Sequence, residues 1–185
     1  MRAVVLASIL GLPALASAHI QLRSPAARTT EQKAGPCGAT GSKRGTNVTT
    51  YQPGQTITLE WDETVDHPGH YRVAIDMDGD DDFINPLRAT DNFSFTLMEP
   101  IADKAGGKYT QQITLPTTPC TNCTLQLMQV MTVTEPYNSF YWQCADIMIA
   151  GDVPEPEPET SGGCQAGRGA GLGIALVLLA LLRRR

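Results

Sequence analysis

The chain has 185 residues, with 14 lysines and arginines against 19 aspartates and glutamates and a formal net charge of −5. This length suits one domain with additional segments rather than two ordinary domains. The acidic balance argues against a protein that binds a nucleic-acid backbone, which needs a basic face, and the 18% share of charged residues argues against a disordered chain.

Residues 1–18 have the pattern of a secretory signal peptide. One positive charge at Arg2 precedes an apolar run, and Ala16-Ser17-Ala18 forms a small-residue cleavage site. A buried N-terminal helix is the alternative interpretation. Cleavage after Ala18 would make His19 the first residue of the exported domain, which we expect to span residues 19–151.

Strand patterns dominate this domain. Polar and apolar residues alternate in four runs, at residues 55–61, 71–75, 93–97 and 124–131. Turn-forming pairs lie between and around them, at Pro53-Gly54, Asn85-Pro86 and Gly106-Gly107. No long stretch has a convincing helical period, so the sequence predicts an all-β domain, an antiparallel β-sandwich.

Four of the five cysteines lie in the predicted domain, at Cys37, Cys120, Cys123 and Cys144. An even number of cysteines in an exported domain indicates two disulfides, with three possible pairings. We favour Cys37–Cys144 and Cys120–Cys123. A zinc site at the Cys-x-x-Cys pair is the alternative, and it requires thiols that stay reduced.

The three histidines occupy two places in the chain. His19 stands at the predicted new N-terminus, and the other two lie in His67-Pro68-Gly69-His70, where a predicted strand begins. An N-terminal histidine offers a metal its free amine and its ring Nδ1, and a second histidine ring adds a third nitrogen. Planar nitrogen donors suit Cu(II), which heads the divalent affinity order. The amine, with a pKa near 8, is a usable ligand at neutral pH. The pattern predicts one copper ion per domain.

At these residues the chain resembles lytic polysaccharide monooxygenases and their relatives. The matching segments are His19-Ile20, Pro36-Cys37-Gly38, His67-Pro68-Gly69, Cys120-Thr121-Asn122-Cys123-Thr124-Leu125-Gln126 and Tyr141-Trp142-Gln143-Cys144-Ala145-Asp146-Ile147. The resemblance implies an immunoglobulin-like β-sandwich with a surface copper held by such a histidine pair, the histidine brace. It also implies oxidative cleavage of chitin, cellulose or a related glycan, with an external reductant and O₂ or H₂O₂. Bacterial members are commonly grouped as chitin-binding domains. A sister group, the fungal copper-acquisition proteins, has the same brace and is thought to carry copper instead.

The resemblance also assigns ligands. The family commonly shows His-x-Gly before the strand, which makes His67 the second copper ligand and leaves His70 as the alternative. The axial place of the family lies three residues before a disulfide cysteine, and Tyr141 stands there relative to Cys144.

One position departs from the family pattern. Several branches have a glutamine two residues before the axial tyrosine, where it assists oxygen activation, and this chain has Ser139. We expect Gln126 to substitute for it in catalysis, with Gln129 or Gln143 as alternatives.

The C-terminal part differs in composition from the domain. Alternating proline and glutamate at residues 154–159 indicate an extended linker over residues 152–163. Residues 164–185 contain Cys164, a glycine-rich stretch, a short apolar run and three terminal arginines. This order resembles the C-terminal sorting tag of myxobacterial surface proteins. It implies that Cys164 is processed or lipidated and that the secreted protein is held in the membrane at the cell surface; a plain hydrophobic tail anchor is the alternative.

Three functions therefore stay open. The protein is a copper-dependent polysaccharide monooxygenase acting on a glycan surface, a non-catalytic protein that takes copper from a donor, or a structural adhesion domain. We expect a monomer with no nucleic-acid partner. The acidic run at residues 76–82 is interpreted as a solvated loop, with Ca²⁺ binding as the alternative, and Asp146 as a hydrogen-bonded structural carboxylate.

Overall fold

The computed structural model describes residues 19–151. The predicted signal peptide with its cleavage site after Ala18, the linker at 152–163 and the C-terminal segment with Cys164 lie outside the described residues. The described part contains eight strands and no helix: β1 (Ile20–Ser24), β2 (Val48–Tyr51), β3 (Thr56–Glu63), β4 (Gly69–Asp76), β5 (Thr96–Ala102), β6 (Gly107–Thr114), β7 (Thr124–Met131) and β8 (Phe140–Ile149). Within residues 19–151 there is accordingly no helix that could span a membrane.

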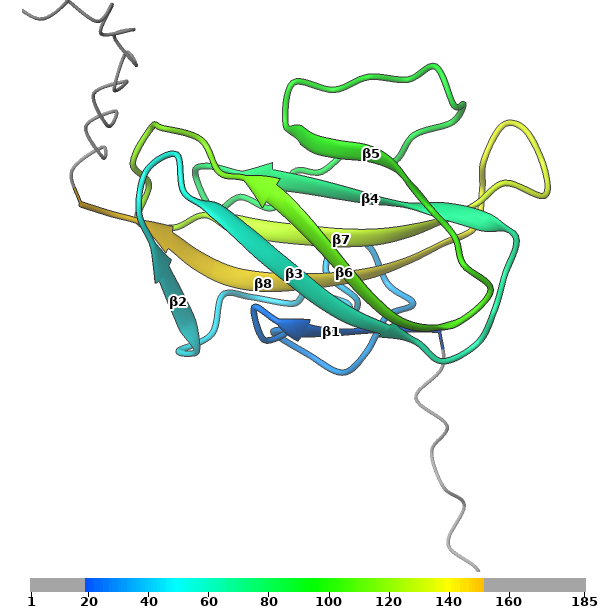
Figure 1. The fold of residues 1–185 in the computed structure, drawn as a ribbon, viewed down its shortest axis with the longest axis horizontal. Coiled ribbons are helices and arrows are strands. Elements are labelled where there is room, and N and C mark those ends of the chain that lie inside the picture. Colours follow the sequence, from blue (N-terminus) through cyan, green and yellow to red (C-terminus); the bar gives the residue numbers. More distant parts are fainter. Residues whose placement is uncertain (1–18, 152–185) are drawn as a thin grey trace, which may run out of the picture. The chain divides into compact units, whose positions relative to one another are not determined.

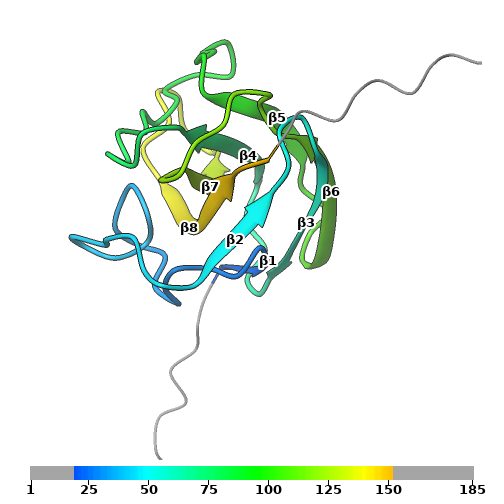
Figure 2. The ribbon, with the colours of Figure 1, turned by 90° about the vertical axis from the view of Figure 1, so that its left-hand side faces the viewer.

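The strands form two sheets that face each other across a common core (Figure 1, Figure 2). One sheet has the order β1-β3-β6 and the other the order β2-β8-β7-β4-β5. The β-sandwich predicted from the sequence is confirmed. One pairing differs from the antiparallel expectation, because β2 runs parallel to β8. These two strands are far apart in the chain, so no hairpin turn dictates their relative direction.

An aromatic cluster joins the two sheets within the core. Ile57, Leu59 and Trp61 are buried on the face of β3 that the alternation predicts. The ring centroid of Trp61 lies 5.0 Å from that of Tyr109 on β6 and 5.2 Å from that of Tyr71 on β4. Burial of such large apolar side chains provides most of the driving force for packing one sheet on the other.

Three of the four alternating runs in the sequence lie in strands of the structure, and the fourth does so only in part. The run at 124–131 coincides with β7, and the runs at 55–61 and 71–75 lie largely within β3 and β4. The run at 93–97 does not form a strand throughout, because β5 begins only at Thr96. Before it, the rings of Phe93 and Phe95 stack on each other and lie 5.7 and 5.6 Å from the guanidinium of the buried Arg72. This segment therefore covers Arg72 instead of extending the ladder.

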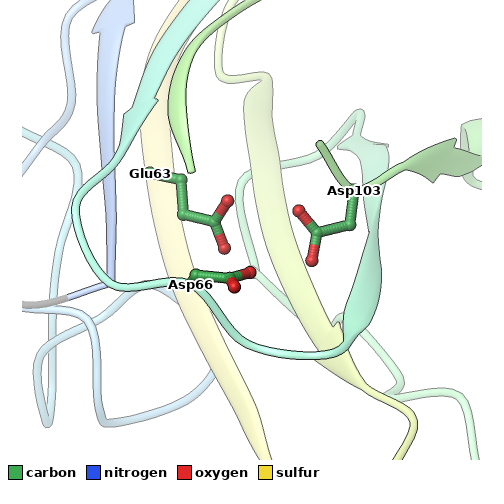
Figure 3. Close-up of side chains that lie close together, drawn as sticks. All are labelled: Glu63, Asp66 and Asp103. Carbon is green, nitrogen blue, oxygen red and sulfur yellow. The ribbon is translucent and has the colours of Figure 1, made fainter. Parts of the chain in front are cut away.

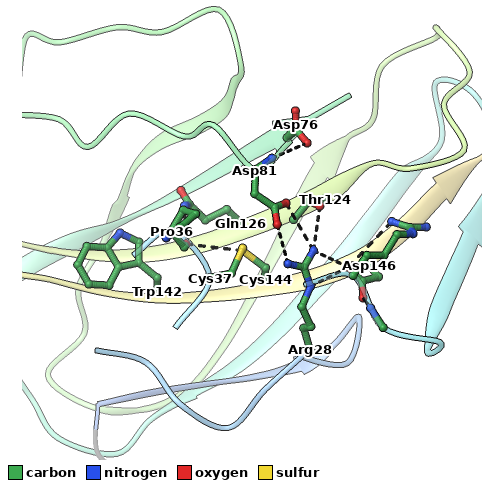
Figure 4. The surroundings of a disulfide bond; sticks show 12 residues. Arg28, Pro36, Cys37, Asp76, Asp81, Thr124, Gln126, Trp142, Cys144 and Asp146 are labelled. Carbon is green, nitrogen blue, oxygen red and sulfur yellow. Dashed lines mark hydrogen bonds and ion pairs between the residues drawn. A yellow bond between two sulfur atoms is a disulfide. The ribbon is translucent and has the colours of Figure 1, made fainter. Parts of the chain in front are cut away.

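The structure pairs the cysteines as Cys37–Cys144 and Cys120–Cys123. The first disulfide ties the long segment between β1 and β2 to β8, across 107 positions of the chain (Figure 4). Both cysteine pairs are therefore engaged, and the Cys-x-x-Cys pair forms a local disulfide rather than a zinc site.

A buried ion-pair network lies beside the first disulfide (Figure 4). The guanidinium of Arg28 donates to Asp81 at 2.7 Å and to Asp146 at 2.6 Å, and its side chain is only 4% exposed. Burial lowers the pKa of Arg28, but the hydrogen bonds and charges of the two carboxylates outweigh it and raise the pKa above its ordinary value. Asp146 also accepts the backbone N–H of Gly45, so it has the structural role predicted for it.

The acidic run at residues 76–82 is more ordered than the solvated loop we expected. Asp76 is buried, and its carboxylate accepts the backbone N–H of Gly79 at 2.7 Å and that of Asp81 at 3.3 Å. Asp81 in turn pairs with Arg28. Two carboxylates of the run are therefore used to fold the loop and attach it to the sandwich.

The two ends of the sandwich carry different parts of the chain. β8 begins at Phe140, where the loop from β7 arrives, and ends at Ile149, where its partners are Tyr51 and Cys120 (Figure 1). His19 lies at the end where β8 begins, because its neighbour Ile20 pairs with Glu63, the last residue of β3. We call this the histidine end.

Candidate metal centre

Three rings from distant parts of the chain meet at the histidine end. His19 lies just before β1, His67 in the connection from β3 to β4, and Tyr141 on β8. The centroid of the His19 ring lies 3.7 Å from that of Tyr141 and 4.8 Å from that of His67, with interplanar angles of 11° and 10°. The fold thus brings together the two histidines and the tyrosine that the sequence singled out.

Backbone pairing with β3 fixes the position of His19. The carbonyl oxygen of His19 accepts the N–H of Thr64 at 2.9 Å, and the backbone nitrogen of His19 lies 2.9 Å from Thr64 Oγ1. The next residue, Ile20, is fully buried and donates to the side chain of Gln32. The backbone nitrogen and the ring of His19 are therefore held at one place, as chelation by both requires.

A tight turn presents His67. The carbonyl oxygen of Pro68 accepts the N–H of Thr132 at 3.2 Å, and Gly69 pairs with Met131 on β7. A Cβ atom at position 69 would overlap the carbonyl oxygen of Val130, so only glycine permits this close approach.

His67 also has a ring nitrogen that fits a metal ligand. Its Nε2 is buried and has no hydrogen-bond partner in the described part of the chain. A buried polar atom left without a partner costs about 1–3 kcal/mol, and a neutral imidazole nitrogen is the commonest protein ligand for metals. The rings of His19 and His67, with the orphaned Nε2 of His67, form a nitrogen donor set that suits copper.

His70 is directed to a different place. Its Nε2 lies 2.8 Å from Glu99 on β5, and its ring meets the edge of Tyr137. Tyr71, the next residue, is in the core between the sheets, and neighbouring residues of a strand face opposite sides. His70 therefore lies on the outer face of its sheet and does not join His19 and His67.

Gln126, expected to assist catalysis, is likewise not brought to the histidines. Its amide nitrogen donates to the carbonyl oxygen of Pro36 at 2.8 Å, and its oxygen accepts from Arg72 at 3.2 Å, on the outer face of β7. The structure directs Gln126 away from the inner face of β7, because successive side chains of a strand point to opposite faces of its sheet. Gln129, three residues further on, lies on the inner face and donates to Glu63 at 2.6 Å.

The other alternative, Gln143, is committed to the backbone. Its Oε1 accepts the N–H of Leu22 at 2.5 Å, and its Nε2 donates to the carbonyl oxygen of Thr29 at 3.0 Å. It thereby ties β8 to β1 and the segment after it. Tyr141, on the same face of β8, is half-buried, and burial raises the pKa of its hydroxyl.

A carboxylate cluster that the sequence analysis missed lies beside the histidines. The carboxyl groups of Glu63, Asp66 and Asp103 point toward one another, with one oxygen of each within 4.8 Å of the others (Figure 3). Glu63 precedes Thr64, the partner of His19, and Asp66 precedes His67. The cluster thus concentrates negative charge at the histidine end, which favours the approach of cations.

Two buried tyrosines support this cluster. The hydroxyl of Tyr109 lies 2.9 Å from Glu63 Oε2 and 2.7 Å from Asp103 Oδ1. Burial, followed by hydrogen bonding to Asp103, raises the pKa of Tyr109. Burial and the charge of Glu63 raise the pKa of Tyr71. Both phenols therefore stay protonated beside the carboxylates.

A cavity of about 280 Å³ opens next to the histidines. It lies between the turn that carries His67 and the loop that joins β7 to β8. Its lining consists of His67, Pro68, Met131, Val133, Thr134, Asn138, Ser139 and Tyr141. None of these residues carries a carboxylate, a guanidinium or an ammonium group, so this side of the histidines is neutral, whereas the side of Glu63 is acidic.

These features define a class: a β-sandwich with paired histidines, one of them at a predicted mature N-terminus, at one end of its sheets. Residues 17–169 match the family model described as copper acquisition factor BIM1-like, and the chain belongs to this family. The match covers well over half of the chain and confirms the resemblance to histidine-brace copper proteins related to copper-acquisition proteins.

Two further comparisons complete these findings. No curated protein matches the chain. Among solved structures, an AA10 lytic polysaccharide monooxygenase from Streptomyces lividans is similar, with 15% sequence identity, a TM-score of 0.43, and coverage of 71% of this chain and 100% of that chain.

Proposed function

We propose that the mature protein binds one copper ion through His19 and His67 and that its function is to capture copper outside the cytoplasm and carry it. The observation that carries the proposal is the convergence of these two histidines, 48 positions apart in the chain, to ring centroids 4.8 Å apart. His19 would hold the ion through its free amine and ring, and His67 through its ring. A copper ion bound there would be either cargo that the protein delivers or a redox centre.

Copper is favoured over other ions by the donor set. All the proposed ligand atoms are nitrogens, and first-row divalent ions bind such sites in an order that peaks at Cu(II). Calcium and magnesium prefer oxygen ligands. The carboxylate cluster of Glu63, Asp66 and Asp103 lies beside the nitrogens and would attract the cation.

Capture is favoured over oxidative chemistry by what lies around the histidines. Family membership points to acquisition. Ser139 lines the cavity where the monooxygenase pattern has a glutamine, and Gln126 faces the other side of its sheet. Without these side chains, the site has fewer hydrogen-bonding groups to position an oxygen species.

Oxidative cleavage of a polysaccharide such as chitin or cellulose is the second candidate. Tyr141 favours it, because its ring stacks on His19 and the resemblance places a tyrosine on the copper axis of the monooxygenases. The two candidates share the same metal ligands and differ only in what the bound copper does. A copper donor would be the partner in the first case, and a glycan surface with a reductant in the second.

The ligand assignment is tested by titration of Cu(II) into four forms of the secreted protein, with calorimetry and electron paramagnetic resonance. The forms are the protein that begins at His19, a form with one additional N-terminal methionine, His67→Ala, and His70→Ala. We expect the extended and His67→Ala forms to lose affinity by orders of magnitude, and His70→Ala to keep it together with three-nitrogen coupling. If the extended form binds as tightly as the mature one, the amine is not a ligand and the proposal fails.

The choice between the two candidates requires a separate experiment. The copper-loaded protein is incubated with ascorbate and a glycan panel, and the products are analysed by mass spectrometry. In parallel, transfer of copper to an apo acceptor is followed by absorbance. We expect transfer without oxidised oligosaccharides; oxidised products that disappear in His67→Ala would establish the enzyme instead.

A further inference from the structure

Met131 occupies an unusual place among the methionines of the described chain. It is the last residue of β7 and is 7% exposed. The other large buried apolar side chains of residues 19–151 belong to one of two hydrophobic clusters, and Met131 belongs to neither. Met131 is therefore buried outside both hydrophobic clusters.

The register of the strands directs Met131 to the histidine end. Gln129 and Met131 are two residues apart, so both face the inner side of β7. Gln129 pairs with Tyr141, whose ring stacks on His19. Met131 pairs with Gly69, two residues after His67, and its N–H donates to the carbonyl oxygen of Ser139 at 3.1 Å. Its backbone is thus fixed between the segments that carry His67 and Tyr141.

Met131 and His67 also line the same cavity of about 280 Å³, together with Tyr141. No charged group lines this cavity, and Gly69, which faces Met131 across the ladder, contributes no side chain that could separate Met131 from the turn. His67, whose Nε2 has no hydrogen-bond partner in the described part of the chain, and Met131 therefore line one cavity without charged side chains.

A thioether in this setting has a specific chemistry. Soft thioether ligands select Cu(I), whereas Cu(II) favours the nitrogen donors already described. Thioethers are neutral, so a neutral cavity suits them, and the negative charge of Glu63, Asp66 and Asp103 lies on another side of the histidines.

We propose that Met131 is a ligand for Cu(I), which the protein would hold between the Met131 thioether and the ring of His67. This inference rests on the proposed function, since it assumes that copper binds at His67. It adds that the site accepts both oxidation states of its cargo, each with a different set of donors.

The experiment uses the full mature protein, loaded anaerobically with Cu(I) in competition with a chromophoric Cu(I) chelator. Met131→Leu is compared with the wild type and with Met128→Leu, a buried methionine of the same strand that lies in the second hydrophobic cluster. We expect Met131→Leu to lose at least about tenfold in Cu(I) affinity, since removal of even an outer partner of a metal ligand costs about 10–100-fold. Cu(II) affinity should stay unchanged, and Met128→Leu should leave both affinities unchanged.

X-ray absorption of the Cu(I)-loaded wild type gives a second readout that needs no variant. We expect a sulfur neighbour of copper in the wild type and in Met128→Leu, and its loss in Met131→Leu. Exchange of methionine for leucine conserves volume and usually costs less than about 1.5 kcal/mol. Should Met131→Leu nevertheless misfold, the wild-type spectrum alone decides.

Unchanged Cu(I) affinity in Met131→Leu, or a wild-type spectrum without sulfur, would overturn this inference. The titrations with His67→Ala distinguish its failure from that of the proposed function. If His67→Ala abolishes Cu(II) binding while Met131→Leu leaves Cu(I) binding intact, only the role of Met131 is wrong. If His67→Ala binds Cu(II) normally, the copper site itself is misplaced.

Discussion

Replacement of Arg28 by methionine should strongly destabilise the domain. Arg28 donates to Asp146 at 2.6 Å and to Asp81 at 2.7 Å, and the side chains of Arg28 and Asp146 are 4% and 2% exposed. The substitution keeps an unbranched apolar stem but leaves Asp81 without its cation and Asp146 with only Arg44, at 4.0 Å. Removal of one partner of a buried ion pair costs about 3–5 kcal/mol, because the remaining charge is buried without compensation.

The structure also gives the expected thermal shift. A domain of the described size unfolds with an entropy of about 0.3 kcal/mol/K, so a loss of about 3–5 kcal/mol lowers Tm by about 10–18 °C. Arg28 lies near Asp146 and Thr124, away from the histidine end. Affinity for Cu(II) should therefore be unchanged at temperatures where the variant is folded.

Urea denaturation and calorimetry at neutral pH measure this effect. Arg23→Met is the matched control, because Arg23 pairs with Asp62 at 2.7 Å on the surface, where the side chains are 51% and 21% exposed. Such exposed pairs contribute about 0–1 kcal/mol. If Arg28→Met costs no more than Arg23→Met, the network does not stabilise the domain and the reasoning is refuted.

Three further outcomes follow from other parts of the structure. Joint replacement of Cys37 and Cys144 by alanine should lower the free energy of unfolding by roughly 4–5 kcal/mol, since this bridge closes a loop of about 100 residues; urea denaturation that shows less than half of this loss would contradict the estimate. Gly69→Ala should push the turn off Val130 and reduce Cu(II) affinity in calorimetry, while a variant that binds normally would show that the turn adapts. Burial raises the pKa of Tyr71 and Tyr109 above the value of about 10 in unfolded chains. The contribution of these two tyrosines to stability is therefore complete below about pH 10 and is lost as the pH rises toward the folded-state pKa. Phenolate absorbance should appear together with unfolding. Ionisation of both tyrosines in the folded protein would argue against their burial.

The sequence was sufficient to predict the elements in which alternation coincides with burial. β3 is an example, because Ile57, Leu59 and Trp61 are buried and the polar residues between them are exposed. β6 was missed although Tyr109 and Ile113 are buried at even spacing. The polar residues between them and the two glycines before them concealed the pattern.

Residues of the candidate site could be predicted where the pattern that identifies them lies within a few positions of the sequence. His19 and His67 stand out because an N-terminal histidine and a His-Pro-Gly turn are visible in a few letters. The carboxylate cluster is not local, since Asp103 follows β5 and reaches Glu63 only through the packing of strands from different sheets. The role of Met131 depends in the same way on which residue it faces across the ladder.

The direction of β8 determines which end of the domain lies next to the C-terminal segment. The strand leaves the histidine end at Phe140, and the described chain ends at Gly151, beyond Ile149 at the far end (Figure 1). Attachment through the segment that follows would therefore hold the molecule by the end opposite His19. If the protein is attached in that way, His19 and His67 would lie at the end of the domain farther from the attachment point.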